Sequence, residues 1–321
     1  MEYKNSKNLI PTVDLGDLGL AHEGEPSERE WTRVAKEITD AFEKVGFVYL
    51  SRHGIPDGRI KKLFEASAAF FNLPQQDKDK YSWDLETYCG YVPVNREKLN
   101  PTSVSEVKET YNIKRADEPF PDEAVPEFRG AMRDFVDSCE RLASRILISM
   151  ALGLDIHRNF FVDAHSRVFR EGNSTALRMI NYPPIIEEKL PNSTRCGPHT
   201  DYGTLTLLFQ DDIGGLQVRD QSTGNWVDAG AIPGTVLVNI GDLMQFWTSG
   251  KFTATEHRVI IPVEEDLRRQ SRRSIAFFLN PDDDKVISPL DGSSKFDPVT
   301  CEEYIRMRIS QSYAGPSNGL E

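Results

Sequence analysis

Three side chains in the second half of the sequence have the types and the spacing of a metal site. His199 and Asp201 stand two residues apart, so an extended segment points both to the same side, and His257 begins a later apolar run. Two histidines and one carboxylate on one side of an Fe(II) ion leave its other positions open for oxygen chemistry. Because a histidine and an aspartate at this spacing also form ordinary structural hydrogen bonds, the pattern needs support from the surrounding sequence.

A pair of anion-binding residues follows His257 by fifteen positions. Arg272 and Ser274 alternate along one predicted strand and therefore share a face. A guanidinium beside a hydroxyl suits a carboxylate, and an arginine inside a barrel needs such an anion to offset its burial. The neighbouring Arg273 is instead interpreted as a surface residue.

The part of the chain that carries these residues is a series of short β-prone runs. They are separated by Gly, Pro, Asn and Asp, and they cover residues 176–182, 204–210, 215–218, 235–240, 257–261 and 274–279. Strands this close together predict a sandwich or a barrel.

Helical patterns dominate the N-terminal part. Ser27 and Glu30 form a capping box, and apolar residues at helical spacing continue to Gly46, where the helix is expected to end. A short strand over residues 47–50 and an amphipathic stretch over residues 60–71 follow.

Three further segments complete the predicted elements. Residues 75–120 are polar and rich in turn residues, which predicts a long ordered loop region. Residues 123–152 carry apolar positions at helical spacing and predict one long packed helix. A last helix is expected to start at Pro298, with Asp297 as its N-cap.

The composition excludes several classes of protein. The 321 residues include 38 basic and 50 acidic side chains, and the net charge of −12 disfavours nonspecific nucleic-acid binding. With 39% hydrophobic residues the chain can bury a sizeable core, so disordered and fibrous classes are excluded. No apolar run is long enough for a membrane span and the start does not resemble a secretion signal. We therefore expect a soluble, cytoplasmic protein, with free thiols at Cys89, Cys139, Cys196 and Cys301.

Motifs in a consistent order and spacing along nearly the whole chain resemble one known family. They are Ile10-Pro11-Thr12-Val13-Asp14-Leu15, Gly46-Phe47-Val48-Tyr49, His53-Gly54-Ile55, Phe70-Phe71-Asn72-Leu73-Pro74, Tyr182-Pro183-Pro184, His199-Thr200-Asp201, Gly214-Gly215-Leu216-Gln217-Val218, Asn239-Ile240-Gly241-Asp242, His257-Arg258-Val259 and Arg272-x-Ser274. The chain resembles the isopenicillin N synthase-like Fe(II)/2-oxoglutarate-dependent dioxygenases, which include plant flavonoid, gibberellin and aminocyclopropane-carboxylate oxidases.

The resemblance implies an α+β fold with a mainly β core, a double-stranded β-helix or jelly roll flanked by N-terminal and C-terminal helices. His199, Asp201 and His257 would hold iron, as metal ligands and catalytic residues. Arg272 and Ser274 would bind the distal carboxylate of 2-oxoglutarate, with a hydrogen bond from Tyr182.

One position departs from the family pattern, and two further family-like stretches carry predictions of their own. Many plant members have an asparagine two residues before the tyrosine, where this chain has Ile180. In the family, Gly241-Asp242 is a tight turn between barrel strands, and Lys108-Glu109 falls in a stretch for which we predict an internal ion pair.

The resemblance also suggests an organisation in four regions that form one compact unit. These are an N-terminal non-haem dioxygenase region (8–120), a long connecting helix (121–172), the jelly-roll core (173–283) and a C-terminal helical tail (284–321).

The implied reaction oxidises an unactivated C–H bond of a small molecule with O2 and 2-oxoglutarate, releasing succinate and CO2, with ascorbate as an expected reductant. Hydroxylation, desaturation and ring closure are all open, in specialised or amino-acid-derived metabolism. Phe278, Tyr91, Tyr88 and Arg96 are predicted substrate contacts. The partners expected are a small molecule, with no nucleic acid or membrane, and the chain is expected to be a monomer.

Two alternatives stay open on the sequence. The first is an Fe(II) oxidase that uses no 2-oxoglutarate, in which Arg272 and Ser274 bind the substrate's own carboxylate. The second is a metal-binding jelly roll without catalysis, or a Zn or Mn protein of the same geometry, although the intact set of ligands disfavours it.

Overall fold

The computed structural model describes residues 9–84, 86–97, 105–186 and 193–313. Within these ranges no helix combines the length and the apolar character that crossing a membrane requires.

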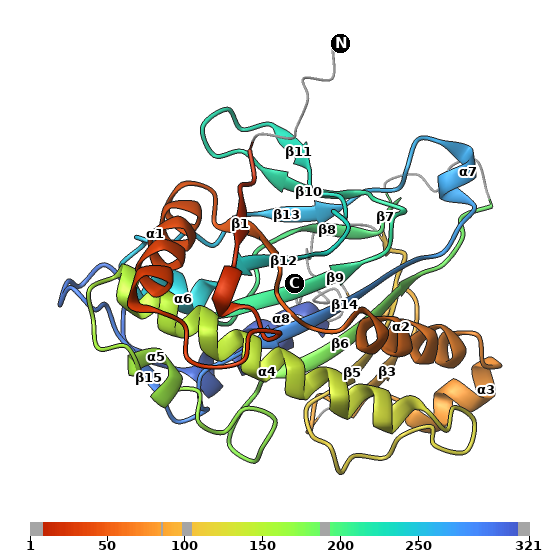
Figure 1. Ribbon diagram of the computed structural model, residues 1–321. Helices are drawn as coiled ribbons and strands as arrows, with labels where there is room; N and C mark the ends of the chain where they lie inside the picture. Colours follow the sequence, from red (N-terminus) through yellow and green to blue (C-terminus); the bar gives the residue numbers. More distant parts are fainter. Residues whose placement is uncertain (1–8, 85, 98–104, 187–192, 314–321) are drawn as a thin grey trace, which may run out of the picture.

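The largest element is a sheet of eight strands (Figure 1). In spatial order they are β1 (Thr12–Asp14), β2 (Phe47–Ser51), β12 (Thr235–Ile240), β9 (Leu205–Gln210), β14 (Arg272–Leu279), β6 (Ala176–Tyr182), β5 (Glu109–Ile113) and β3 (Gly90–Val92). Strand β14 pairs antiparallel with β6 and β9, and its register sets Arg272 opposite Tyr182 and Ser274 opposite both Ile180 and Gln210.

A smaller sheet of four strands faces part of the large one. Its order is β11 (Trp226–Asp228), β10 (Leu216–Arg219), β13 (His257–Val259) and β8 (Cys196–His199). Apolar residues from both sheets fill the space between them, among them Phe47, Leu237, Leu216 and Val259. The expected jelly roll is therefore confirmed, as two facing sheets rather than as a closed barrel.

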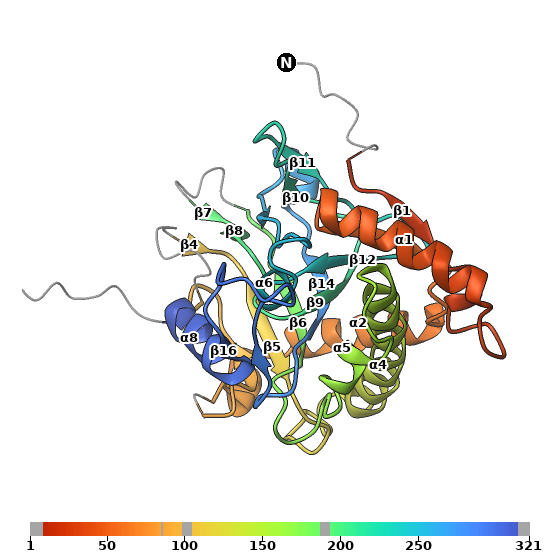
Figure 2. The same cartoon turned by 90° about the vertical axis from the view of Figure 1, so that its left-hand side faces the viewer.

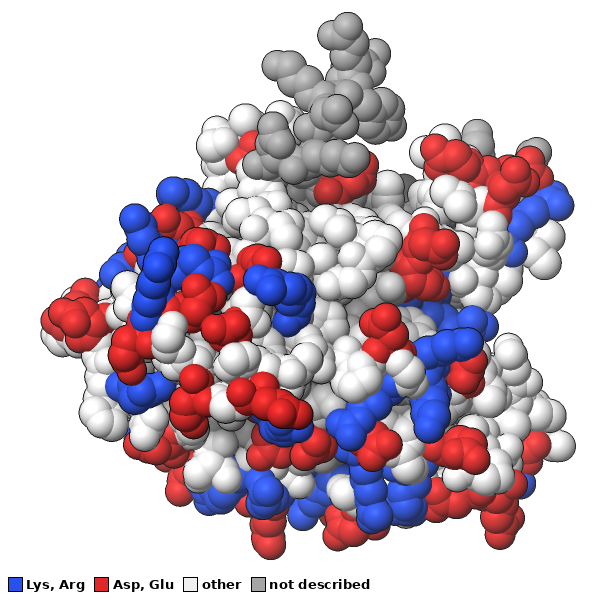
Figure 3. Space-filling view, in the orientation of Figure 1, with Lys and Arg blue, Asp and Glu red and all other residues white. Residues whose placement is uncertain are grey.

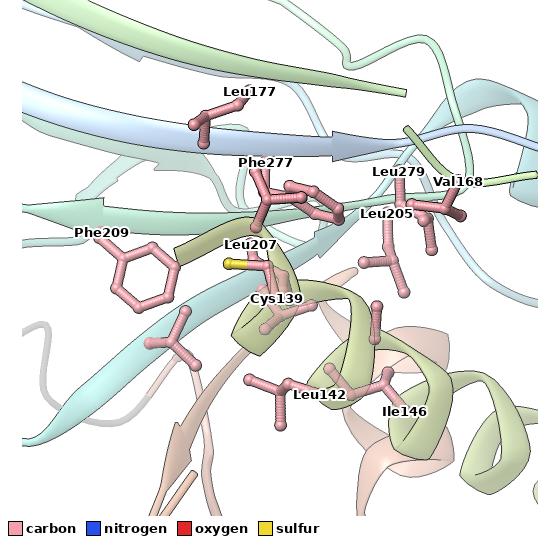
Figure 4. Close-up of a cluster of buried hydrophobic side chains, with 14 of the residues drawn as sticks. Cys139, Leu142, Ile146, Val168, Leu177, Leu205, Leu207, Phe209, Phe277 and Leu279 are labelled. Atoms are coloured by element: carbon pink, nitrogen blue, oxygen red, sulfur yellow. The ribbon is translucent and has the colours of Figure 1, made fainter. Parts of the chain in front are cut away.

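Three helices cover the other face of the large sheet (Figures 1 and 2). They are α1 (Glu28–Lys44), α2 (Asp57–Phe71) and α4 (Phe128–Gly153). The apolar face of α4, with Cys139, Leu142 and Ile146, packs against side chains of β9 and β14 such as Leu207 and Phe277 (Figure 4). This burial fixes the outer face of the large sheet against the helices. Helix α8 (Cys301–Tyr313) lies on the opposite side (Figure 2).

Short elements connect these layers. They are η2 (Gly16–Leu18), α3 (Gln75–Lys78), η3 (Asp79–Tyr81), β4 (Ser105–Glu106), α5 (Phe160–Asp163), β7 (Ser193–Thr194), α6 (Asp242–Trp247), α7 (Glu265–Arg268), β15 (Val286–Ile287) and β16 (Val299–Thr300). On the face shown in Figure 3, acidic and basic side chains are interspersed. Exposed ion pairs of this kind contribute little to stability.

Several predicted elements are confirmed by the structure. Helix α1 begins after Ser27, whose hydroxyl accepts a hydrogen bond from the Glu30 N–H at 3.3 Å. The predicted strands over residues 176–182 and 235–240 coincide with β6 and β12.

Three predictions are wrong in detail. Residues 75–120 are not only loop, because β3 and β5 join the large sheet, and β5 lacks an alternating pattern since all of its residues are buried. The last helix starts at Cys301, where the Thr300 hydroxyl, and not Asp297, accepts the Glu303 N–H. Asp242 is not in a tight turn between strands but begins helix α6.

Candidate active site

The pairing of β8 with β13 brings two histidines together, since His199 stands directly opposite His257 in the register. Their ring centroids are 4.3 Å apart. Asp201 follows β8, and its Oδ1 lies 3.8 Å from Nε2 of His199 and 3.6 Å from Nε2 of His257. One ligand atom from each residue therefore lies within 4.8 Å of the other two, and His257 and Asp201 are buried. The three sequence-predicted ligands form one site.

Hydrogen bonds orient the Asp201 carboxylate from the large sheet. Its Oδ2 accepts the Thr206 hydroxyl at 2.5 Å and the Asn239 amide at 2.7 Å. Because Oδ2 is held from β9 and β12, Oδ1 faces the two histidines. Outer contacts of this kind fix a metal ligand before the metal binds.

Backbone carbonyls orient both imidazoles. Nδ1 of His199 lies 2.8 Å from the Gly197 carbonyl oxygen, and Nδ1 of His257 lies 3.1 Å from that of Thr255. These contacts favour the tautomers in which Nδ1 donates its hydrogen. The lone pair of each Nε2 then points into the space between the three residues.

The electrostatics of the site also suit a cation. Burial and the neighbouring His199 lower the pKa of His257 to about 4. Burial raises the pKa of the Asp201 carboxyl, but the two histidines and the hydrogen bonds from Asn239 and Thr206 outweigh it, so this pKa lies below its usual value. At neutral pH the site therefore offers neutral imidazole and an ionised carboxylate, the forms that bind metals.

A cavity of about 60 Å³ leads from the triad to the predicted anion-binding residues, and Tyr182, Arg272 and Ser274 line it. Arg272 is 1% exposed; its Nη2 donates to Gln210 at 2.8 Å and its Nη1 to the Ser274 hydroxyl at 3.4 Å. The guanidinium carbon lies 4.9 Å from the centroid of the Tyr182 ring. Burial raises the pKa of Tyr182 to about 12, so its hydroxyl keeps the hydrogen that it can donate.

Two buried arginines, Arg272 in the wall of the cavity and Arg195 close to Arg272, fit an anionic cosubstrate. Nε of Arg272 has no partner among the described residues, and the same holds for Nε and Nη1 of the fully buried Arg195. Within that part of the chain neither arginine forms an ion pair with a carboxylate. Burial and the proximity of Arg272 lower the pKa of Arg195 to about 10. Two buried guanidinium groups that form no direct ion pair with a carboxylate among the described residues favour the binding of an anion such as 2-oxoglutarate.

A second cavity, of about 100 Å³, adjoins the triad on its other side. His199, Asp201, Arg178 and Phe278 border both cavities. The second one is closed by Glu97, Ser174, Ala176, Tyr202, Gly203 and Asn280, together with Ile305, Ile309 and Ser312 of α8. Nη1 of Arg178 donates to Glu97 at 3.0 Å, and the guanidinium lies 5.6 Å from the centroid of the Phe278 ring. Phe278, a predicted substrate contact, thus borders the same two cavities as His199 and Asp201.

The other three predicted substrate residues lie elsewhere. Tyr91 is 1% exposed and packs in an aromatic cluster, where its hydroxyl donates to Glu109 at 2.6 Å. The ring of Tyr88 packs beside that of Trp83, and Arg96 is exposed. None of the three borders either cavity of the site. The structure brings Phe278 to the triad, but not Tyr88, Tyr91 or Arg96, since nearness to a turn-rich segment does not determine which way a side chain points.

Lys108 and Glu109 both form internal ion pairs, as predicted, but not with each other. Nζ of Lys108 lies 2.8 Å from Glu106 and 3.1 Å from Glu97, whereas Glu109 pairs with Lys78 at 2.8 Å. The two side chains therefore have different partners, and Lys108 itself lies between β4 and β5.

Sequence reasoning did not assign roles to several residues that orient the site. Thr206 and Gln210 lie in a predicted strand and Asn239 in a family motif, but only their contacts reveal what they do. Arg178 and Arg195 carried no signal beyond their charge.

Two family models match the chain. Residues 173–281 match the 2OG-Fe(II) oxygenase superfamily, and residues 10–131 match the non-haem dioxygenase in morphine synthesis N-terminal family. The chain is 31% identical to the 2-oxoglutarate-Fe(II) type oxidoreductase ppzD of Metarhizium rileyi, over 97% of this chain and 94% of that one. It is 32% identical to the proline hydroxylase buaE of Petromyces alliaceus, over 85% and 91% of the two chains.

Solved structures lead to the same family. A full-length Neurospora crassa protein, solved in complex with alpha-KG and thymine, superposes with a TM-score of 0.83 at 32% identity, covering 95% of this chain and 97% of that chain. The protein belongs to the 2OG-Fe(II) oxygenase superfamily, and it is an Fe(II)- and 2-oxoglutarate-dependent oxygenase that uses O2 as its co-substrate.

We predict that Thr206→Val weakens Fe(II) binding by about 10–100-fold, because the carboxylate of Asp201 loses an orienting hydrogen bond. The measurement is an anaerobic Fe(II) titration of metal-free protein. Thr206→Ser keeps the hydroxyl and should bind Fe(II) as the wild type does. Equal affinity in all three proteins would contradict the role of Thr206.

Proposed function

We propose that His199, Asp201 and His257 hold Fe(II), and that Arg272, Ser274 and Tyr182 hold 2-oxoglutarate. The observation that carries this proposal is one continuous cavity, which starts at three convergent ligand atoms and ends at a buried guanidinium whose Nε has no partner among the described residues. The iron and cosubstrate, when bound, supply the oxidation of a C–H bond by O2 with release of succinate and CO2.

The residues of the chain orient this chemistry and exclude water from it. The guanidinium of Arg272 and the hydroxyls of Ser274 and Tyr182 offer donors to the distal carboxylate. Ile180, opposite Ser274 in the sheet, gives the middle of the cavity an apolar wall. The large sheet thus binds the cosubstrate, while the small sheet supplies both histidines.

The second cavity is the proposed substrate site, and its lining favours a small polar molecule. Arg178 and Glu97 offer charged hydrogen-bonding groups, and Phe278 offers a flat apolar surface. The names of relatives support this size class, since one neighbour was solved with thymine and one relative is called a proline hydroxylase. The outcome of the reaction is hydroxylation, desaturation or ring closure, in specialised or amino-acid-derived metabolism.

We further propose that the chain acts as a monomer in the cytoplasm. The triad and the residues that border both cavities come from one chain, which supports a monomer. The four cysteines are unpaired, as is usual in a reducing compartment. The four predicted regions, 8–120, 121–172, 173–283 and 284–321, act as one unit in this proposal, supported by an apolar core with members from each of them.

Arg272→Ala is predicted to weaken 2-oxoglutarate binding by about 30-fold or more, because removing one partner of a buried charged contact costs about 2–5 kcal/mol. Metal-free protein is loaded anaerobically with Fe(II) and titrated with 2-oxoglutarate, and the weak visible charge-transfer band of the chelated keto acid is followed.

Arg273→Ala is the matched control, because Arg273 is on the opposite face of the same strand and borders neither cavity. Its titration should superpose on that of the wild type. If the Arg272→Ala protein binds 2-oxoglutarate with wild-type affinity, the assignment of this arginine to the cosubstrate is wrong, and the residue is free to bind the substrate's own carboxylate.

Ile309→Trp should block the substrate site while leaving the cosubstrate site intact, because Ile309 borders only the second cavity. A panel of nucleobases and amino acids is screened for stimulated succinate formation by the wild type, and the active compound is then tested on the variant. We expect about a 5- to 150-fold loss of stimulation, since overpacking costs about 1–3 kcal/mol, with an unchanged charge-transfer titration. Met307→Trp, at an exposed position on the same helix, should behave as the wild type.

A further inference from the structure

Helix α8 is both a wall of the second cavity and a neighbour of the segment that carries Asp201. Ile305, Ile309 and Ser312 of α8 border the cavity together with His199 and Asp201. The helix comes from the end of the described chain, more than 90 residues after the metal carboxylate, and packs on the side of the large sheet opposite to α4 (Figure 2). The contacts of α8 with the rest of the protein therefore determine the position of this side of the cavity.

Two of these contacts reach Tyr202, the residue that follows Asp201. The Tyr202 hydroxyl and the Ser312 hydroxyl are hydrogen-bonded at 2.8 Å. The guanidinium carbon of Arg308 lies 4.3 Å from the centroid of the Tyr202 ring, a cation–π contact. Helix α8 thus touches the aromatic side chain directly adjacent to a metal ligand.

A third connection runs through Asp242, at the start of α6. The N–H of Asp242 donates to the Asp201 carbonyl oxygen at 2.8 Å, and the N–H of Leu243 donates to that of Tyr202 at 3.1 Å. The Asp242 carboxylate, which is buried, accepts hydrogen bonds from the Tyr304 hydroxyl at 2.7 Å and from Arg308. The backbone N–H of Asp242 therefore binds the segment that carries Asp201, and its carboxylate binds α8.

Arg308 takes part in both the contact with Tyr202 and the connection through Asp242. Its Nη1 donates to Asp242 and to the Tyr304 hydroxyl, and its plane covers Tyr202. Its side chain is only 23% exposed, so the ion pair is largely shielded from solvent and contributes more than a surface pair. Arg306, two positions earlier, is by contrast 61% exposed and pairs with Glu302 of its own helix.

We propose that Arg308 is a positioning residue that couples helix α8 to the Asp201 segment, so that metal binding at the triad and docking of α8 against the substrate cavity stabilise each other. The proposal rests on the assignment of His199, Asp201 and His257 as metal ligands. Since coupling between two sites is reciprocal, an ordered Asp201 segment favours a docked α8, and a docked α8 favours metal binding.

The test is hydrogen–deuterium exchange of the peptide over residues 301–313 in the full chain, with and without Mn(II), an ion that carboxylate sites also accept and that avoids turnover. In the wild type we expect Mn(II) to slow exchange in α8 by about fivefold or more. In Arg308→Met the effect of Mn(II) on α8 should be lost or strongly reduced, and the Mn(II) affinity, measured by electron paramagnetic resonance, should fall by a similar factor. Arg306→Met, the matched control, should retain both wild-type responses.

The difference made by Mn(II) separates coupling from a purely structural role. A residue that only stabilises α8 would change exchange equally with and without the metal, and that result would overturn the proposal. The proposal would also be overturned if bound Mn(II) left the exchange of α8 in the wild type unchanged. Failure of the wild type to bind Mn(II) would overturn the ligand assignment and the coupling with it. Ser312→Ala, which removes only the hydrogen bond to Tyr202, gives a milder second variant that should weaken the response in the same direction.

Discussion

The pairing of β8 with β13 is the constraint on which the rest of the site depends. Antiparallel register sets His199 opposite His257, and backbone carbonyls two residues earlier orient both rings. The small sheet does not position the carboxylate by itself. Asp201 lies beyond the end of β8, and side chains of β9 and β12 in the large sheet orient it. The site therefore exists only where the two sheets face each other. The apolar contacts between the sheets, and those between the large sheet and α4, are what keep that spacing fixed.

Electrostatics divide the interior into two regions of different character. The chain as a whole has a net charge of −12, yet Arg272 borders the first cavity without a direct ion pair to a carboxylate among the described residues, and the buried Arg195 lies near it. The second cavity has instead the paired charges of Arg178 and Glu97. An isolated buried cation is costly and a satisfied pair is less so, so the first cavity suits an anion and the second suits a neutral polar molecule. His199 and Asp201 of the triad border both cavities, whereas His257 borders only the first.

Much of this was predictable from the sequence, and the failures have physical reasons. His199, Asp201 and His257 could be found because ligand chemistry restricts the residue type at each position, and the strand period placed Arg272 and Ser274 on one face. Strand β5 was missed because full burial on both faces removes alternation from its sequence. Tyr91 was misplaced because its hydroxyl satisfies Glu109 in the interior, a pairing that depends on contacts distant in the sequence. Asp242 was assigned to a turn, whereas its carboxylate serves residues more than 60 positions later.

The most direct test of the central claim is a crystal structure of the protein grown without oxygen in the presence of Fe(II) and 2-oxoglutarate. We predict iron bound by His199, Asp201 and His257, and the cosubstrate in the cavity between the sheets, with its distal carboxylate on Arg272, Ser274 and Tyr182. A metal bound by other residues, or a distal carboxylate held away from Arg272, would contradict it.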